Sequence, residues 1–467
     1  MKTFELIIVG GGAGGFAAAI RANELKAKTA LINAGLPWGG TCVNVGCVPS
    51  KRLLWAGEVM HAVNNHKIPG IELKLEKFDF QKVVQDELSL VSRLREEKYE
   101  RVAKDLDSVT LIEGKAKFVS EKEVEINGER LEAEKFIIAT GSTADVLPIE
   151  GIEAVGYVTH IGALKLEALP KRLLILGAGP VSIEFAQMYA RFGSEVTMIK
   201  RSPGILRFAE EELTERLTEI LEKEGVSIIS DAMTKRAYRE NGQKVLSVFY
   251  DGKAEEITGD EILLATGKTP NTQGLGLGTA GVEVDEKSAV VVNDFFQTSQ
   301  PHIHAVGDVV NLPLRHETTA GREGTLAAQN ALTGSRDSID YDAVPFTIFT
   351  DPQLAGVGFT EDEQMEKMGV CECRTISFDT VPKAIIMNRT EGLIKMAIHP
   401  ETEQIMGVHI LAPSAGELIA EAMMLVKNKN TIDDVVNSLP MFPTMSEAIK
   451  IVALSFTKDV SKLSCCI

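Results

Sequence analysis

Two cysteines, Cys42 and Cys47, lie five residues apart in a stretch that ends at Lys51 and has the pattern of the start of a helix. Thiols at this spacing can close a small disulfide loop, and a thiolate at a helix N-terminus beside a lysine has a lowered pKa and is reactive. Two buried free cysteines or half of a zinc site are the alternatives, although no further ligands lie nearby at the required spacing. The stretch favours a redox-active thiol pair.

A second pair of adjacent thiols, Cys465 and Cys466, stands just before the last residue. A segment so close to a terminus is expected to be mobile, and thiolates prefer soft metal ions. The pair is therefore a candidate for collecting a soft ion and passing it to the first pair, while two incidental surface thiols are the alternative. Cys371 and Cys373 match no motif and are interpreted as ordinary buried or surface residues.

A glycine-rich turn near the N-terminus is expected to bind a dinucleotide. Residues 4–9 have the pattern of a strand, and Gly10, Gly12 and Gly15 follow them before a helical stretch. This context places a pyrophosphate at a helix N-terminus, where free N–H groups bind it. Asn33 ends the next strand where an acid commonly binds the ribose, and an amide can still hydrogen-bond a hydroxyl group.

A second turn of this kind follows residues 172–176 and contains Gly177 and Gly179, with Ser182 at the third glycine position. The next strand ends at Lys200 and Arg201 rather than at an acid. Two cations favour the 2′-phosphate of NADP over the 2′-hydroxyl of NAD, whereas a solvated basic strand end is the alternative interpretation.

The elements that carry these residues alternate between strand and helix, which predicts doubly wound parallel sheets, and short β-like runs dominate residues 340–467. The 467 residues carry a formal net charge of −17, which argues against a general nucleic-acid surface. No apolar run reaches the roughly 18 residues of a membrane helix. Without a charged leader at the N-terminus, we expect a cytoplasmic protein with no membrane insertion.

The chain resembles the flavoprotein disulfide reductases over essentially its whole length, through residues 39–51, the two glycine-rich turns, and residues 139–141, 265–271 and 304–308. The resemblance implies that the first turn binds FAD and the second binds NADPH. It implies that Cys47 lies next to the flavin, that Cys42 exchanges with substrate, and that Lys51 pairs with Glu184 beside the flavin ring. The expected cofactor-binding residues are Gly10, Gly12, Ala13, Gly15, Asn33, Thr41, Lys51, Ala116, Thr140, Gly141, Gly177, Gly179, Lys200, Arg201, Gly267 and Asp308, the last of these on the ribityl chain.

Family members that act on organic disulfides carry a His-Pro-x-x-x-Glu segment near the C-terminus, and here Phe442 stands in place of the histidine. Phenylalanine cannot transfer a proton, which argues against disulfide substrates. Together with the tail thiols, this resembles the mercuric reductases. That resemblance implies reduction of Hg(II), delivered as a thiol complex, to Hg(0) by NADPH and FAD, with Cys42, Cys47, Cys465 and Cys466 as metal ligands. Tyrosines that many members carry are replaced by Pro180 and Phe442.

The resulting expectation is an α/β protein with two doubly wound nucleotide-binding domains and an α+β C-terminal dimerisation domain. The FAD domain is expected at residues 1–146 and 272–337, the NADP domain at 147–271 and the dimerisation domain at 338–467. The resemblance also implies a homodimer with composite active sites. Two alternatives stay open: a dihydrolipoamide- or glutathione-type reductase that lost its histidine, and a redox-sensing flavoprotein that only sequesters metal.

Overall fold

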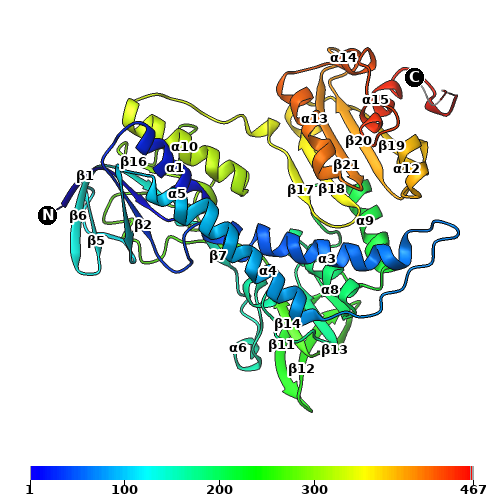
Figure 1. Ribbon diagram of the computed structural model, residues 1–467, viewed down its shortest axis with the longest axis horizontal. Coiled ribbons are helices and arrows are strands. Elements are labelled where there is room, and N and C mark those ends of the chain that lie inside the picture. The colour runs from blue at the N-terminus through cyan, green and yellow to red at the C-terminus, as the bar shows by residue number, and fades with distance from the viewer. Residues whose placement is uncertain (1, 463, 465–467) are drawn as a thin grey trace.

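Three units, each built around its own sheet, make up the computed structural model, which describes residues 2–462 and residue 464 (Figure 1). The N-terminal unit contains the strands between residues 2 and 138 and one at 303–305, the middle unit those between 172 and 264, and the C-terminal unit those between 346 and 412. None of the helices in these described ranges is both long enough and apolar enough to cross a membrane.

A seven-stranded sheet organises the N-terminal unit and presents the first glycine-rich turn. β1 (Lys2–Val9) pairs in parallel with a strand on each side, and α1 (Ala13–Glu24) begins just after the turn. Alternate side chains of β1 enter two cores: Leu6 and Ile8 pack on the side of α1, and Ile7 and Val9 pack on the opposite face. A strand buried on both faces requires the continuous apolar run seen in the sequence.

The sheet has the order β3-β2-β1-β6-β5-β4, with β16 beside β6. Its other strands are β2 (Thr29–Asn33), β3 (Val109–Glu113), β4 (Lys117–Phe118), β5 (Glu123–Ile126), β6 (Glu129–Ile138) and β16 (Ile303–Ala305). The short helix η2 (Gly307–Val309) and α10 (Glu317–Thr333) follow, and α10 packs against α1.

Two long helices, α3 and α4, with three short ones connect the N-terminal unit to the middle unit, as the blue ribbons of Figure 1 show. They are α2 (Gly40–Val45), α3 (Cys47–Asn65), α4 (Phe80–Arg95), the π-helical segment η1 (Glu96–Glu100) and α5 (Arg101–Lys104). The helix α3 packs against both α4 and α8 (Pro180–Phe192) of the middle unit. This packing holds the start of α3 between the two units.

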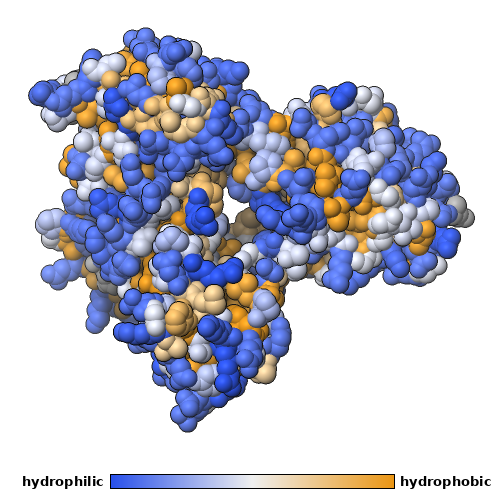
Figure 2. All heavy atoms as spheres, turned by 180° about the vertical axis from the view of Figure 1, so that it is seen from behind, coloured by the Kyte–Doolittle hydropathy of each residue, from blue (hydrophilic) through white to orange (hydrophobic). Residues whose placement is uncertain are grey.

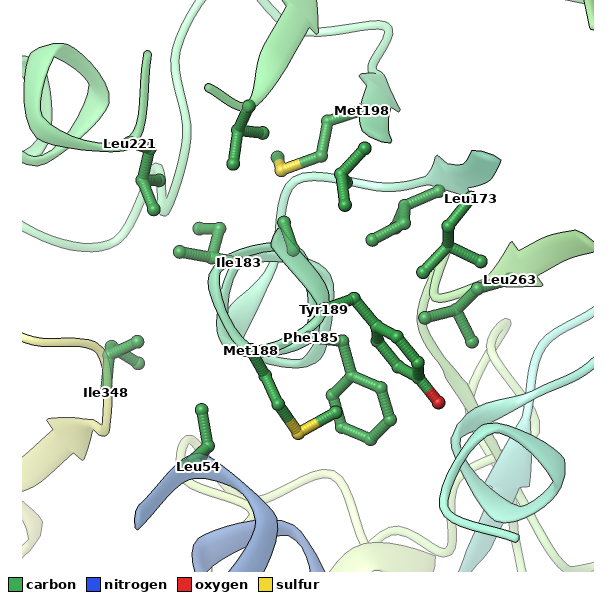
Figure 3. Close-up of a cluster of buried hydrophobic side chains, with 14 of the residues drawn as sticks. Leu54, Leu173, Ile183, Phe185, Met188, Tyr189, Met198, Leu221, Leu263 and Ile348 are labelled. Atoms are coloured by element: carbon green, nitrogen blue, oxygen red, sulfur yellow. The ribbon is translucent and has the colours of Figure 1, made fainter. Parts of the chain in front are cut away.

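The middle unit repeats the strand–turn–helix arrangement around a four-stranded parallel sheet of order β10-β9-β8-β14. In Figure 3, α8 lies at the centre of its core: Ile183, Phe185, Met188 and Tyr189 fill the space between Leu173 and Leu263 of the sheet, Leu54 of α3, and Ile348. The strands and helices are β8 (Arg172–Leu176), β9 (Glu195–Ile199), α9 (Glu211–Lys223), β10 (Ser227–Ile229), β14 (Glu261–Leu264), α6 (Ile152–Val155) and α7 (His160–Ala163).

An antiparallel sheet of β11 (Met233–Glu240), β12 (Gln243–Tyr250) and β13 (Lys253–Gly259) covers part of the same unit, and β7 (Ser142–Ala144) pairs with β15 (Lys268–Pro270).

The C-terminal unit is an antiparallel sheet of order β17-β18-β21-β20-β19 with helices packed on it. Its strands are β17 (Phe346–Ile348), β18 (Gln353–Gly358), β19 (Glu372–Ser377), β20 (Leu393–Ile398) and β21 (Ile405–Ala412). Its helices are η3 (Tyr341–Ala343), α11 (Glu361–Met368), η4 (Phe378–Thr380), α12 (Pro382–Met387), α13 (Ala415–Lys427), α14 (Ile432–Val436), α15 (Glu447–Leu454) and η5 (Val460–Lys462). A mixed sheet with a parallel β3-β2-β1-β6-β16 core, a four-stranded parallel sheet and an antiparallel α+β unit confirm the predicted α/β fold class.

Candidate active site

A cavity of about 1870 Å³ lies where the three units meet, and Figure 2 shows the hollow between them from behind. The carboxyl ends of β1 and β8 both point to this region, as expected for ligand sites of open parallel sheets. The residues predicted from the sequence that line it are Gly12, Ala13, Thr41, Cys42, Cys47, Lys51, Gly141, Gly177, Gly179, Glu184, Lys200, Arg201, Gly267 and Asp308. Both predicted nucleotide sites and the thiol pair therefore open into one space.

The thiol pair lies at a helix junction. Cys42 belongs to α2, Cys47 is the first residue of α3, and Gly46 separates the two helices. Both thiols are free, and their Sγ atoms lie within 4.8 Å of each other and of a carboxylate oxygen of Glu317.

The two thiols differ in their affinity for the proton. A hydrogen bond from the Cys42 thiol lowers the pKa of Cys47, and this effect, with a smaller one from the positive charge of Lys51, outweighs burial and the negative charge of Glu317, which both raise it. The same contact with Cys47, together with burial, raises the pKa of Cys42. The geometry therefore favours a thiolate at Cys47 and a thiol at Cys42.

An ion pair between α3 and α8 fixes the lysine beside the thiols. The Lys51 Nζ atom lies 2.7 Å from Glu184 Oε2, and the Glu184 side chain is only 6% exposed. The backbone N–H of Phe349 donates to the other oxygen of Glu184 at 2.9 Å, and the ammonium lies 4.5 Å from the Phe349 ring centroid. Contacts from all three units thus hold the Lys51 charge in place.

The first glycine-rich turn fits a dinucleotide. Gly10 has φ +126°, and a Cβ there would come within 2.0 Å of the Ala139 carbonyl oxygen. A Cβ at Gly15 would lie 1.7 Å from the Gly10 carbonyl oxygen, so Gly15 permits the close approach of α1 to β1. Gly12 caps α1 with an extended backbone and no side-chain cap. The N–H groups of the first turn of α1 are therefore free to bind a pyrophosphate from the cavity.

The remaining predicted residues of this site take different positions. Asp308 lines the cavity and accepts a hydrogen bond from the Ser142 hydroxyl at 2.6 Å, which leaves carboxylate lone pairs for a ligand hydroxyl. Gly10, Gly15, Asn33, Ala116 and Thr140 do not line the cavity among the described residues. Asn33 donates to the Leu36 carbonyl at 2.8 Å.

The two cations predicted to bind a 2′-phosphate, Lys200 and Arg201, have different surroundings in the structure. Lys200 is only 4% exposed, and its ammonium donates to the carbonyls of Ser202 and Pro203. Burial lowers its pKa. Arg201, by contrast, is exposed on the cavity wall, and so is Arg207 from the same loop. Lys200 therefore holds the loop, and the two arginines present charge to the cavity.

Two residues of the cavity wall, Arg207 and Glu317, were not predicted from the sequence. Arg207 follows Arg201 by six residues, and a survey of cations across the whole loop would have found it. Glu317 opens α10, far from the cysteines in the sequence, and only the packing of α10 on α1 brings it to the thiols. No local motif identifies it.

The other predicted features lie elsewhere. Cys465 and Cys466 lie outside the described residues. Phe442 is 44% exposed and is not part of the described cavity wall. Cys371 and Cys373 are half-buried at the start of β19 and do not belong to that wall either.

Comparison with known proteins agrees with this arrangement. Residues 4–332 match the model of the pyridine nucleotide-disulphide oxidoreductases, and residues 344–453 match the dimerisation domain of the same family. A mercuric reductase from Lysinibacillus sphaericus is 38% identical over 463 residues, which cover 99% of this chain and 84% of the relative. A mercuric reductase from Streptomyces lividans is 37% identical, with 99% and 98% covered.

A dihydrolipoyl dehydrogenase from Thermus scotoductus is 39% identical, and the match covers 96% of both chains. Among solved structures, the Cu(II) complex of the HOCl-induced flavoprotein disulfide reductase RclA from Escherichia coli superposes with a TM-score of 0.88 at 27% identity, covering 98% of this chain and 100% of that chain. These matches confirm the resemblance inferred from the sequence motifs. The chain belongs to the pyridine nucleotide-disulphide oxidoreductase family.

Proposed function

We propose that this protein reduces Hg(II) to Hg(0) at the expense of NADPH, with FAD bound in the N-terminal unit and NADPH bound in the middle unit. The observation that carries the proposal is the polarised pair of free thiols, Cys42 and Cys47, in a cavity shared by both nucleotide sites. Soft thiolates select soft metal ions. The full-length similarity to mercuric reductases supports the same substrate.

Each cofactor has residues that fit it. The N-terminus of α1 and Gly12 would hold the FAD pyrophosphate, and Asp308 would bind a hydroxyl of its chain. Arg201 and Arg207 would hold the 2′-phosphate of NADPH. When bound, FAD supplies a two-electron carrier between NADPH and the thiol pair.

The thiols would take Hg(II) from its complex with two small thiols by ligand exchange. Cys42 forms one S–Hg bond and gives its proton to the small thiol that leaves, and the Cys47 thiolate then displaces the second ligand as a thiolate. Two electrons reduce the ion, both S–Hg bonds break and Hg(0) departs, so both cysteines are left as thiolates. No proton is added to the metal, which fits Phe442 in place of a histidine base.

A homodimer would complete the site. The loop at residues 438–444 exposes Leu439, Met441 and Phe442, of which Leu439 is 95% exposed, and the unit that carries it matches a dimerisation domain. Apolar side chains on such a loop fit a partner subunit. We propose that Cys465 and Cys466 of one subunit pass Hg(II) to Cys42 and Cys47 of the other.

The direct test is NADPH oxidation by the FAD-loaded protein with Hg(II) and an excess of small thiol. Oxidation should rise well above the background with oxygen, and Hg(0) should leave the solution as vapour. Without any stimulation by Hg(II), the proposal fails. Tight Hg(II) binding without release of vapour would instead identify a metal-sequestering flavoprotein.

A disulfide reductase is the second candidate, favoured by the 39% identity to a dihydrolipoyl dehydrogenase. The same assay with lipoamide or glutathione disulfide in place of Hg(II) separates the two. Rapid turnover of a disulfide together with no response to Hg(II) would favour this alternative.

Replacing both tail cysteines by alanine (C465A/C466A) tests the delivery step. We expect kcat/KM to fall about tenfold or more when Hg(II) carries a bulky dithiol ligand, because a second pair of thiols raises the local concentration of ligands for the ion. With a small monothiol the loss should be within about threefold, since the inner pair can exchange such ligands directly. The matched control is C371A/C373A, which removes two thiols outside the cavity wall. Equal losses with both Hg(II) complexes would contradict delivery.

A further inference from the structure

The carboxylate of Glu317 lies at the redox pair, although the steps proposed above give it no role. Its oxygen and the Sγ atoms of Cys42 and Cys47 form a cluster in which every pair of donor atoms is within 4.8 Å. Ligands about 2–2.3 Å from one ion fall within such a separation. The described residues contain no other group of three such donors.

We propose that Glu317 is the third ligand of the soft divalent ion that Cys42 and Cys47 hold, so that the inner site has two sulfur donors and one oxygen donor. This proposal rests on the proposed function, since it names a further residue for the same substrate. All three donors of this inner site come from one subunit, and the tail cysteines of the partner subunit only deliver the ion to it.

The surroundings of Glu317 support a ligand role. Its side chain is exposed to the cavity, and its neighbour there is the Cys42 thiol rather than a cation. The Cys47 thiolate and the Glu317 carboxylate repel each other at this distance, and a dication between them removes that repulsion. Such a cluster is unfavourable for an empty site and favourable for one that receives a cation.

The two positions where related enzymes carry tyrosines cannot supply an oxygen donor here. Pro180 lines the cavity without a polar side-chain atom, and Phe442 has none either. Glu317 of α10 offers an anionic oxygen instead. A third donor also makes recapture of the ion by external thiols slower, because three bonds must be exchanged instead of two.

Glu317 is neither oxidised nor protonated when the bound ion is reduced. Two electrons convert Hg(II) to Hg(0), the two S–Hg bonds and the O–Hg contact break, and the donors remain as two thiolates and one carboxylate. A carboxylate that keeps its charge throughout is not consumed and needs no further reagent.

The test measures metal binding directly with Cd(II), a soft dication that NADPH does not reduce. The FAD-loaded enzyme is treated with NADPH without oxygen to keep the thiols reduced, and it carries C465A/C466A so that only the inner site responds. Ultraviolet thiolate-to-metal absorption then reports binding in competition with a chelator. We expect Glu317→Gln to weaken Cd(II) binding about tenfold or more, which is the range for loss of a ligand or of its immediate support.

Glu211→Gln is the matched control, because Glu211 is likewise the first residue of a helix, α9, and is exposed away from the thiols. Its Cd(II) affinity should equal that of the parent, and Glu317→Asp should recover part of the loss. Unchanged Cd(II) binding in Glu317→Gln, with the thiol count and flavin spectrum of the parent, would overturn the ligand role while leaving Hg(II) reduction standing. If the enzyme with its native tail fails to reduce Hg(II), the proposed function fails. The Cd(II) titration then still shows whether Glu317 is a ligand of the inner site.

Discussion

Replacing Cys47 or Cys42 by alanine is expected to lower Hg(II)-dependent NADPH oxidation by roughly 10³-fold or more, the size of effect seen when a covalent group of a catalytic unit is removed. Cys47 carries the thiolate beside Lys51, and in the proposed mechanism the Cys42 thiol receives the ion. Either loss leaves a single sulfur, which cannot hold Hg(II) between two thiolates. Steady-state assays at saturating NADPH measure the effect.

The control for this prediction is the double variant C371A/C373A, which removes the same number of thiols from the C-terminal unit. It should keep the parent activity within about twofold, because surface or half-buried changes away from the site have small effects. Bound FAD and its absorption spectrum should be unchanged in all variants. A Cys47→Ala protein that retains a tenth of the parent Hg(II) activity would show that the pair is not the reducing centre.

The local part of this site could be predicted from the sequence. A glycine turn between a strand and a helix is a local motif, and at Gly15 the atom that would exclude a Cβ is the Gly10 carbonyl oxygen of the same turn. At Gly10 that atom is the Ala139 carbonyl oxygen, which reaches the turn only because β6 pairs with β1. The spacing of Cys42, Cys47 and Lys51 is equally local, because α2 and α3 are adjacent helices.

What depends on packing could not be predicted. Lys200 and Arg201 are neighbours in the sequence, but the loop after β9 folds back so that Lys200 binds its carbonyls and Arg201 faces the cavity. A charge pattern alone does not show which of two adjacent cations is buried. Glu317 reaches the thiols only because α10 packs on α1 after the whole middle unit has intervened.

The packing of α10 also affects what the missing histidine at position 442 implies about the substrate. From the sequence, the missing base argued against disulfide substrates, but the fold places the Glu317 carboxylate within the same cluster as both sulfurs. A carboxylate can accept a proton as well as bind a metal ion. The replacement of histidine by Phe442 therefore does not by itself exclude disulfide substrates. Assays that compare Hg(II) with disulfides decide the substrate class.

The double variant R201S/R207S is expected to reverse the proposed preference for NADPH over NADH. Both guanidinium groups face the cavity from the loop between β9 and α9, close to the second glycine-rich turn. Each charge-assisted hydrogen bond to a phosphate contributes about 1.5–3 kcal/mol. Loss of both should therefore reduce kcat/KM for NADPH roughly 10²–10⁴-fold, mainly through KM.

NADH lacks the 2′-phosphate, so its kcat/KM should change by less than about threefold in the same variant. The matched control is Arg216→Ser on α9, which removes an exposed arginine of the same unit that pairs with Glu219. This variant should leave kcat/KM unchanged for both NADPH and NADH. If the double variant lost activity equally with NADPH and NADH, the arginines would support the loop rather than read the 2′-phosphate, and the role would pass to Lys200, whose ammonium would then have to leave the carbonyls of Ser202 and Pro203 when NADPH binds.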